Sequence, residues 1–271
     1  MLLARIATAA LLLAGFLAAN FLLARPQFAV LMSLVVASAA YEWARLCRLA
    51  GGAPLAYGGL VGGLLAALTI ALPAGAGAQG ATNGLLLAAG LFWIIVAPIW
   101  LWRGVAAQPR LLLAAAGLMV LVPAGLAAVA LSPADLLVLL GLVWLADSAA
   151  YFTGRAFGRR KLAPTISPGK TWAGVWGAVL ATSAYAIICA VSIPTLASRI
   201  DGLAWVPYVA GAVLLCFVSV VGDLFESALK RQAGVKDSGT LLPGHGGILD
   251  RIDSATATLP VGALLLHWIL V

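Results

Sequence analysis

The sequence predicts an all-α polytopic membrane protein, and its composition, its apolar segments and its distribution of cations all indicate this class. Of its 271 residues, 63% are hydrophobic and only 9% are charged, and the mean hydropathy is +1.09. A soluble globular domain carries about 25% charged residues. Because so little polar surface is available, lipid must be the main solvent, which excludes a soluble protein with a large core.

Nine apolar segments are long enough to cross a bilayer, for which a helix needs about 20 mostly apolar residues. Proline or small residues separate most of them, and two longer polar loops, 154–171 and 226–254, interrupt the second half. We therefore predict a bundle of about nine transmembrane helices. The expected spans are 3–24, 27–45, 55–73, 84–102, 111–131, 134–153, 172–194, 205–225 and 255–271.

The first segment resembles a signal peptide, because Arg5 precedes a long Leu/Ala run. That run extends from Ile6 to Leu23, which is longer than the roughly 7–15 apolar residues of a cleaved leader. We therefore expect a retained first span.

The cations predict the orientation of these spans. If the N-terminus is cytoplasmic, all of the 16 cations except Arg25 and Arg199 lie on the cytoplasmic side, as the positive-inside rule requires. We expect an integral protein of the bacterial inner membrane with both long polar loops in the cytoplasm. The net charge of +7 does not indicate nucleic acid as a partner, because the cations sit between apolar runs, where they suit anionic headgroups and a polyanionic substrate.

No linker divides the chain, so we predict a single membrane domain, 1–271. Residues 1–131 are expected to serve mainly as scaffold and dimer surface. Residues 134–271 carry both long polar loops and therefore the chemistry.

Carboxylates are concentrated in and just before the second polar loop, 226–254. Five of the nine acidic residues lie between 223 and 253, and Asp147 lies near the cytoplasmic end of the sixth span. Carboxylates beside apolar spans usually face a polar cavity or a partner. The five are Asp223, Glu226, Asp237, Asp250 and Asp253.

The spacing of these residues places them on shared helix faces. Asp223, Glu226 and Lys230 stand at i, i+3 and i+7, and Asp250 and Asp253 stand at i and i+3. If the helices pack together, several oxygen ligands converge at one membrane depth. Such hard ligands suit Mg²⁺, which binds one or two carboxylates together with substrate phosphates.

Glycines cluster just before Asp250. Gly244, Gly246 and Gly247 surround His245 in a segment that precedes a helix start, where free N–H groups favour an anion. The alternatives of a simple turn, and of a loop-stabilising role for His245, stay open.

The loop 154–171 is rich in cations and contains Gly169-Lys170-Thr171, which resembles part of a phosphate-binding P-loop. That motif needs glycine at position 164, where this chain has Pro164, so it is rejected. We retain Lys170 as a phosphate contact and Ser167 as a neighbouring binding residue.

Together these segments resemble the phosphatidate cytidylyltransferase family. The segment 227–253 matches the family signature without a gap, and residues 147–172 are similar to the family's other polar loop. Tyr41-Glu42-Trp43 also resembles the family, whereas Ala173 stands where the family pattern has Glu. The matching signature residues are Ser227, Leu229, Lys230, Arg231, Lys236, Asp237, Gly239, Leu242, Pro243, His245, Gly246, Gly247, Ile248, Asp250, Arg251, Ile252 and Asp253.

The resemblance implies that CTP and phosphatidic acid give CDP-diacylglycerol and pyrophosphate. It implies Mg²⁺ bound by Asp223 and Asp250, with room for a monovalent cation such as K⁺, and it implies a homodimer. We assign Asp147 and Asp253 as further ligands or supporting groups, and His245 as a catalytic-loop residue. The expected phosphate contacts are Lys170, Lys230, Arg231, Lys236, Arg251, Ser167, Gly246 and Gly247.

Two other functions stay open. One is a cytidylyltransferase for a different lipid phosphate, such as an isoprenoid-ether lipid, since the apolar groove rather than the signature would select the lipid. The other is a transporter or channel with the carboxylates as a cation path. Against the latter, the charges gather at the cytoplasmic ends of the spans instead of crossing the membrane.

Overall fold

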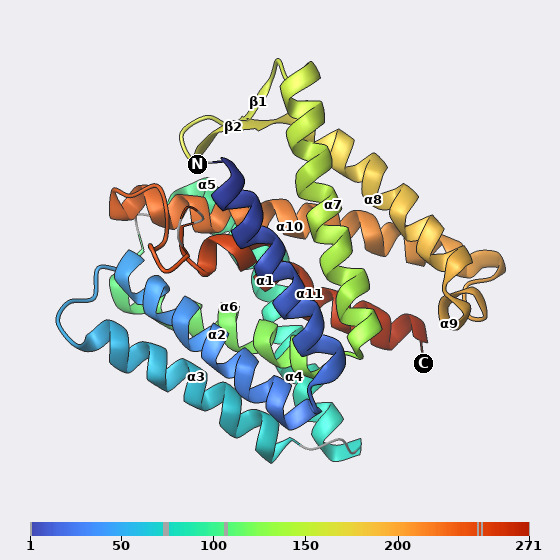
Figure 1. The fold of residues 1–271 in the computed structure, drawn as a ribbon. Helices are drawn as coiled ribbons and strands as arrows, with labels where there is room; N and C mark the ends of the chain where they lie inside the picture. Colours follow the sequence, from blue (N-terminus) through green and yellow to red (C-terminus); the bar gives the residue numbers. More distant parts are fainter. Residues whose placement is uncertain (1, 73–75, 106–107, 243, 245, 271) are drawn as a thin grey trace.

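The computed structural model describes residues 2–72, 76–105, 108–242, 244 and 246–270, and most of them are helical. Figure 1 shows long helices crossing one another, with one short β-hairpin. The helices of the first half are α1 Leu2–Leu22, α2 Arg25–Leu46, α3 Ala53–Ala71, α4 Ala76–Leu91, the π-helical turn Phe92–Val96, α5 Ala97–Arg103 and α6 Arg110–Ala130. The second half contains α7 Pro133–Phe157, β1 Lys161–Ala163, β2 Ser167–Thr171, α8 Trp172–Ser192, α9 Pro194–Ala197, a 3₁₀ turn Gly202–Ala204, α10 Trp205–Ala233 and α11 Leu249–Leu270.

Seven helical segments in the described part of the chain are long and apolar enough to cross a membrane. This confirms the polytopic all-α class. The first and last predicted spans are also helical, as α1 and α11, but they are not among these seven, so the count of nine stays a prediction. The seven are Arg25–Leu46, Ala53–Ala71, Gln79–Arg103, Arg110–Ala130, Pro133–Phe157, Trp172–Ser192 and Gly202–Ala233.

The helix bounds in the structure differ most from the predicted spans around the second polar loop, 226–254. α10 continues through Ala233 instead of ending at 225, and α11 begins at Leu249 instead of 255. The polar residues of these added turns stay helical because they pair with one another, as Glu226 does with Lys230. The connection between the two helices is therefore only the chain 234–248.

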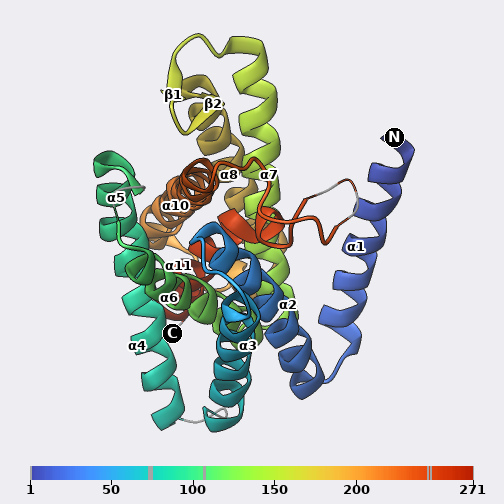
Figure 2. The same cartoon turned by 90° about the vertical axis from the view of Figure 1, so that its left-hand side faces the viewer.

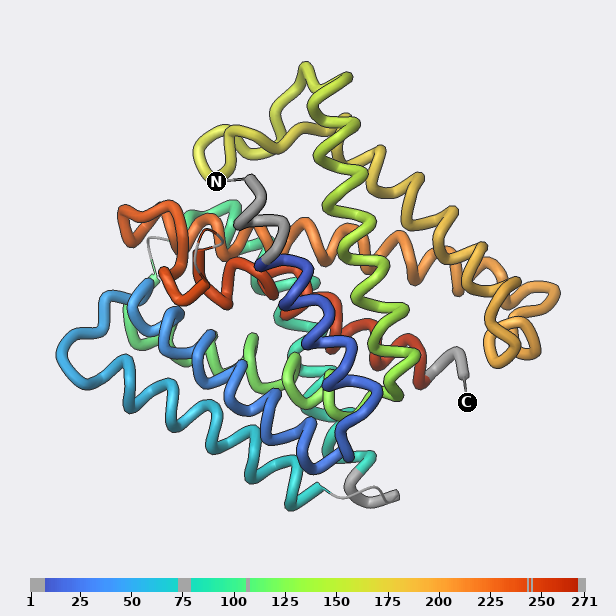
Figure 3. Tube along the Cα trace, in the orientation of Figure 1, coloured from blue at the N-terminus to red at the C-terminus, as the bar shows by residue number. Residues whose placement is uncertain are grey.

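Helices pack in pairs that are neighbours in sequence: α2 with α3, α7 with α8, and α10 with α11. In Figures 1 and 3 the α7–α8 pair crosses α10, with the hairpin end of the pair above it, and the α2–α3 pair lies below α10. Small residues allow close crossings, as expected for helices in lipid. A Cβ at Gly222 of α10 would lie 2.8 Å from the Asp253 carbonyl oxygen of α11. This crossing brings the two acidic helices together.

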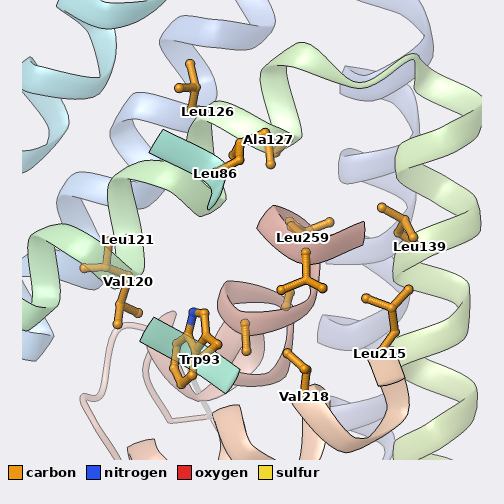
Figure 4. Packing of buried hydrophobic residues seen from close by; sticks show 14 of the residues in the cluster. Leu86, Trp93, Val120, Leu121, Leu126, Ala127, Leu139, Leu215, Val218 and Leu259 are labelled. Atoms are coloured by element: carbon orange, nitrogen blue, oxygen red, sulfur yellow. The ribbon is translucent and has the colours of Figure 1, made fainter. Parts of the chain in front are cut away.

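The core lies where α10 and α11 meet the first half of the chain. Phe225 is fully buried and packs its ring against Trp43, Phe92, Trp93 and Trp100, with centroids 5.7–6.2 Å apart. Figure 4 shows Val218 and Leu259 in the same apolar cluster as Trp93. The polar turns that follow Phe225 in α10 are therefore fixed to a rigid aromatic core.

The predicted loop 154–171 is largely ordered as secondary structure. α7 extends to Phe157, and β1 then pairs antiparallel with β2, with Lys161 opposite Thr171 and Ala163 opposite Ser167. Thr171 begins α8, because its side-chain oxygen accepts a hydrogen bond from the Gly174 N–H at 3.1 Å. The hairpin lies beside the upper end of α7, where the chain passes from α7 to α8 (Figure 2).

Candidate active site

A cavity of about 700 Å³ lies between α7, the hairpin, the start of α8, α10 and α11. Four carboxylates from three helices line it, together with three cations from α7 and the hairpin. The structure therefore brings four of the six predicted acidic residues, distant in sequence, into one cavity. The lining carboxylates are Asp147, Asp223, Asp250 and Asp253, and the cations are Arg155, Lys161 and Lys170.

Asp223 is the more open of the two predicted metal ligands. Its carboxylate forms an ion pair with Lys170 of β2 at 2.6 Å, and these side chains are 27% and 24% exposed. Ser227, one turn further along α10, donates a hydrogen bond to the other carboxylate oxygen at 3.2 Å. Lys170, the predicted phosphate contact, thus forms an ion pair with Asp223, the predicted metal ligand.

Asp250 is enclosed, with its side chain only 5% exposed. One carboxylate oxygen accepts a hydrogen bond from Lys230 at 2.7 Å. The other accepts three, from the Ser238 N–H at 2.8 Å, the Ser238 hydroxyl at 3.0 Å and the Gly247 N–H at 2.8 Å. The chain between α10 and α11 therefore wraps around this carboxylate.

Lys230 links the two acidic helices. Its ammonium group lies 2.7 Å from Glu226 on its own helix and 2.7 Å from Asp250 on α11. The i, i+4 pairing of Glu226 with Lys230 follows from the helical spacing seen in the sequence. All three side chains are at most 13% exposed, so this is a buried charge cluster.

The two polar loops meet. Arg231, near the end of α10, donates a hydrogen bond to the Ile166 carbonyl of the hairpin turn at 3.2 Å. Ser167 lines the cavity beside that turn. Ser167 and Lys170 thus lie on the hairpin side of the cavity, whereas Arg231 contacts the hairpin turn without being among the lining residues.

The other predicted site residues in this region lie in the chain 234–248 between α10 and α11, or directly after it. Gly246 has a φ of 79°, and a Cβ there would lie 2.7 Å from the Asp250 carboxylate, so glycine is needed at this position. Lys236 and Arg251 are exposed. His245 lies outside the described residues, and its role stays a prediction.

A divalent metal fits the donors of this cavity. Asp223 and Asp250 line it together, and Ser219 adds a buried hydroxyl oxygen without a hydrogen-bond partner in the described structure. Within the described ranges, no three His, Cys, Asp or Glu side chains are grouped closely enough to hold an ion by themselves. Mg²⁺ commonly takes one or two carboxylates and fills its remaining positions with water and substrate phosphates. The residues therefore suit a magnesium ion that substrate completes.

Glu42 of α2 and Ser238 also belong to this region, although the sequence predicted no site role for them. Glu42 is 1% exposed and accepts a hydrogen bond from the Ser238 hydroxyl at 2.9 Å. A signal was present, because a carboxylate inside an apolar span is costly and usually functional. Nothing in the sequence said which of the later loops it would meet.

A family model described as the cytidylyltransferase family matches residues 3–269. A phosphatidate cytidylyltransferase of Pseudomonas aeruginosa is 42% identical over 280 residues, which covers 98% of this chain and 97% of that relative.

Two shorter matches concern proteins of the same name. The Haemophilus influenzae protein is 52% identical over 122 residues, which is 44% of this chain and 41% of that protein. The Thermotoga maritima protein is 41% identical over 132 residues, which is 49% of this chain and 48% of that protein. Because the family model spans almost the whole sequence, and the Pseudomonas relative nearly its full length, this chain belongs to the cytidylyltransferase family.

Proposed function

We propose that the chain is a phosphatidate cytidylyltransferase, which transfers CMP from CTP to phosphatidic acid and releases pyrophosphate. The observation that carries this proposal is one cavity that combines four carboxylates with the cations of the hairpin. A nucleoside triphosphate and a lipid phosphate are both anions, which cationic side chains can bind. A metal ion shared by the two phosphates is in turn bound by carboxylates. The family and the names of the relatives agree with this reaction.

The reaction requires positioning more than proton transfer. A phosphatidate oxygen attacks the α-phosphorus of CTP, the new P–O bond forms, and the bond to the bridging oxygen of pyrophosphate breaks. A phosphate monoester is already largely ionised at neutral pH, since its second pKa is about 6. No side chain therefore has to remove a proton, and the task of the site is to hold two polyanions together.

The residues divide this task by charge. Lys170, Lys161 and Arg155 line the cavity and would bind phosphate oxygens. Asp223 and Asp250 would hold Mg²⁺, which neutralises phosphate charge when bound. We propose phosphate-binding or supporting roles for the remaining predicted residues, and a monovalent cation beside the magnesium ion. These residues are Lys230, Arg231, Lys236, Arg251, Ser167, Gly246, Gly247, His245, Asp147 and Asp253.

The cavity would face the cytoplasm, where CTP is available. Supporting this orientation, the hairpin and the end of α10, which touch through Arg231 and Ile166, carry many of the cations. We propose nine spans with the N-terminus in the cytoplasm of a bacterial inner membrane. The homodimer stays a prediction from the resemblance.

The proposal can be tested with the purified protein in detergent, CTP and a panel of lipid phosphates, with and without Mg²⁺. We expect CDP-lipid formation with phosphatidic acid, and little with an isoprenoid-ether lipid phosphate. Product formation only from the isoprenoid-ether lipid would overturn the lipid assignment. No CTP turnover with any lipid would overturn the enzymatic proposal.

Asp223→Asn tests the metal assignment within the same assay. We expect turnover to fall by about 10²-fold or more, because a metal ligand is removed from the reacting site. The free energy of unfolding should change little, since Asp223 is partly exposed. Full Mg²⁺-dependent turnover in this variant would refute the assignment.

A further inference from the structure

Glu42 is a buried carboxylate far in sequence from every other residue of the site. It lies near the end of α2, and its carboxylate accepts hydrogen bonds from the Ile248 N–H at 3.1 Å and the Leu249 N–H at 2.8 Å. These N–H groups belong to the beginning of α11, where backbone donors lack partners within the helix. Glu42 thus caps α11 from a different helix, directly before Asp250.

The charge of Glu42 is not neutralised by an ion pair in the described part of the chain. A buried carboxylate held only by hydrogen bonds is expensive. The positive end of the α11 dipole offsets part of this cost. An uncharged side chain could fill the same space more cheaply, so the position of Glu42 suggests a role in the site.

Ser238 connects Glu42 to Asp250. Its hydroxyl lies 2.9 Å from the Glu42 carboxylate and 3.0 Å from the Asp250 carboxylate, and its N–H donates to Asp250 at 2.8 Å. A hydroxyl has one hydrogen to donate, so the two carboxylates compete for it. Glu42 and Asp250 therefore both accept hydrogen bonds from Ser238. Figure 2 shows the chain between α10 and α11 passing over the end of α2.

Two glycines of the loop leave space for Glu42. A Cβ at Gly239 would lie 2.8 Å from the carboxyl carbon of Glu42, and a Cβ at Gly247 would lie 2.6 Å from it. Real Cβ atoms essentially never approach so closely. The loop therefore closes around the Glu42 carboxylate, just as it closes around Asp250.

We propose that Glu42 is a positioning residue, which fixes Ser238 and the first turn of α11 so that Asp250 is held ready for the metal. This inference rests on the proposed function, in which Asp250 binds Mg²⁺. The N-terminal half of the chain would thereby contribute to the site, beyond the scaffold role expected for residues 1–131. Glu42 itself would touch neither metal nor substrate.

The test is Glu42→Gln, with Mn²⁺ binding measured by electron paramagnetic resonance in the absence of CTP and lipid. The amide can accept at only one atom, so it cannot serve the three donors that face Glu42. We expect Mn²⁺ to bind about 10–100-fold more weakly, as is typical when a group that orients a metal ligand is lost. In turnover assays kcat should fall while the KM for phosphatidic acid stays the same.

Ser33→Ala is the matched control. Ser33 is also buried on α2, and its hydroxyl bonds to the Ala29 carbonyl of the same helix at 2.8 Å. It should bind Mn²⁺ like the unaltered protein. If Glu42→Gln lowers only the thermal stability and binds Mn²⁺ normally, Glu42 is a structural cap and the inference is wrong.

A double-mutant cycle keeps the inference testable if Glu42→Gln folds poorly. Gly239→Ala should weaken Mn²⁺ binding in the unaltered protein, because its Cβ displaces Glu42, but not in Glu42→Ala, where the space is free. Additive losses would contradict the inference. Failure of Asp223→Asn and Asp250→Asn to weaken Mn²⁺ binding would instead overturn the proposed function, so the two failures are distinguishable.

Discussion

Asp223 and Asp250 line the same cavity, yet the protein surrounds them in different ways. Within the described residues Asp223 has a single ion-pair partner, Lys170 from the hairpin, and about a quarter of each side chain is exposed. Asp250 is 5% exposed, and its carboxylate accepts four hydrogen bonds from Lys230, Ser238 and Gly247. A partly solvated pair can exchange partners at low cost, whereas a buried network is rigid. Asp223 is thus suited to exchange Lys170 for another cation, and Asp250 to stay fixed.

Lys230→Met should have the largest effect on stability. It leaves Glu226 and Asp250, 3% and 5% exposed, without their shared cation. Removing one partner of a buried charge cluster costs about 4 kcal/mol in the free energy of unfolding, which a denaturant titration in detergent would measure. Lys236→Met, at an exposed cation of the same region, should change stability by less than about 0.5 kcal/mol. Equal effects of the two substitutions would show that the cluster around Asp250 is not a rigid unit.

Asp250→Asn should destabilise the protein less, by about 2 kcal/mol, because Lys230 keeps Glu226 as a partner. The amide nitrogen would face either the Lys230 ammonium group or the N–H groups of Ser238 and Gly247, and donors repel donors. Turnover should also fall by about 10²-fold or more. Asp223→Asn is the comparison: it should lose as much activity but less than about 1 kcal/mol of stability. Similar stability losses in both variants would remove the contrast between the two carboxylates.

Much of this arrangement could be predicted from the sequence. Helical spacing places Glu226 and Lys230 on one face, and they form an ion pair. Apolar segment lengths predict helices at all nine expected spans. The convergence of Asp147, Asp223 and Asp250 follows because polar groups at the ends of apolar helices need a shared cavity.

Other features depend on tertiary contacts that local pattern does not contain. The hairpin is not predictable from a period-two pattern, because β1 has only three residues and β2, Ser167–Thr171, contains no apolar residue that could alternate with the polar ones. The extra turns of α10 are polar and were therefore expected as loop, but Lys230 pairs with Glu226 within the helix and with Asp250 of α11. Glu42 meets Ser238 across 196 positions of sequence, and a lone carboxylate carries no spacing that names its partner.

Lys170→Met should have only a small effect on stability, and its effect on metal binding has the opposite sign to that of Asp250→Asn. The pair with Asp223 is about a quarter exposed, so losing it should cost less than about 1 kcal/mol. Because the ammonium group occupies the carboxylate that the metal needs, its removal should tighten Mn²⁺ binding in the absence of substrate by up to about fivefold. Turnover should nevertheless fall, since a phosphate contact is lost.

Lys161→Met separates local competition from the general positive potential of the cavity. Lys161 lines the same cavity on β1, but it forms no ion pair with Asp223 in the described structure. It should therefore raise Mn²⁺ affinity less than Lys170→Met does. Weaker Mn²⁺ binding in Lys170→Met would show that Lys170 orients Asp223 for the metal instead of competing with it. Asp223 would then be held in place as firmly as Asp250, by a single lysine instead of a closed loop.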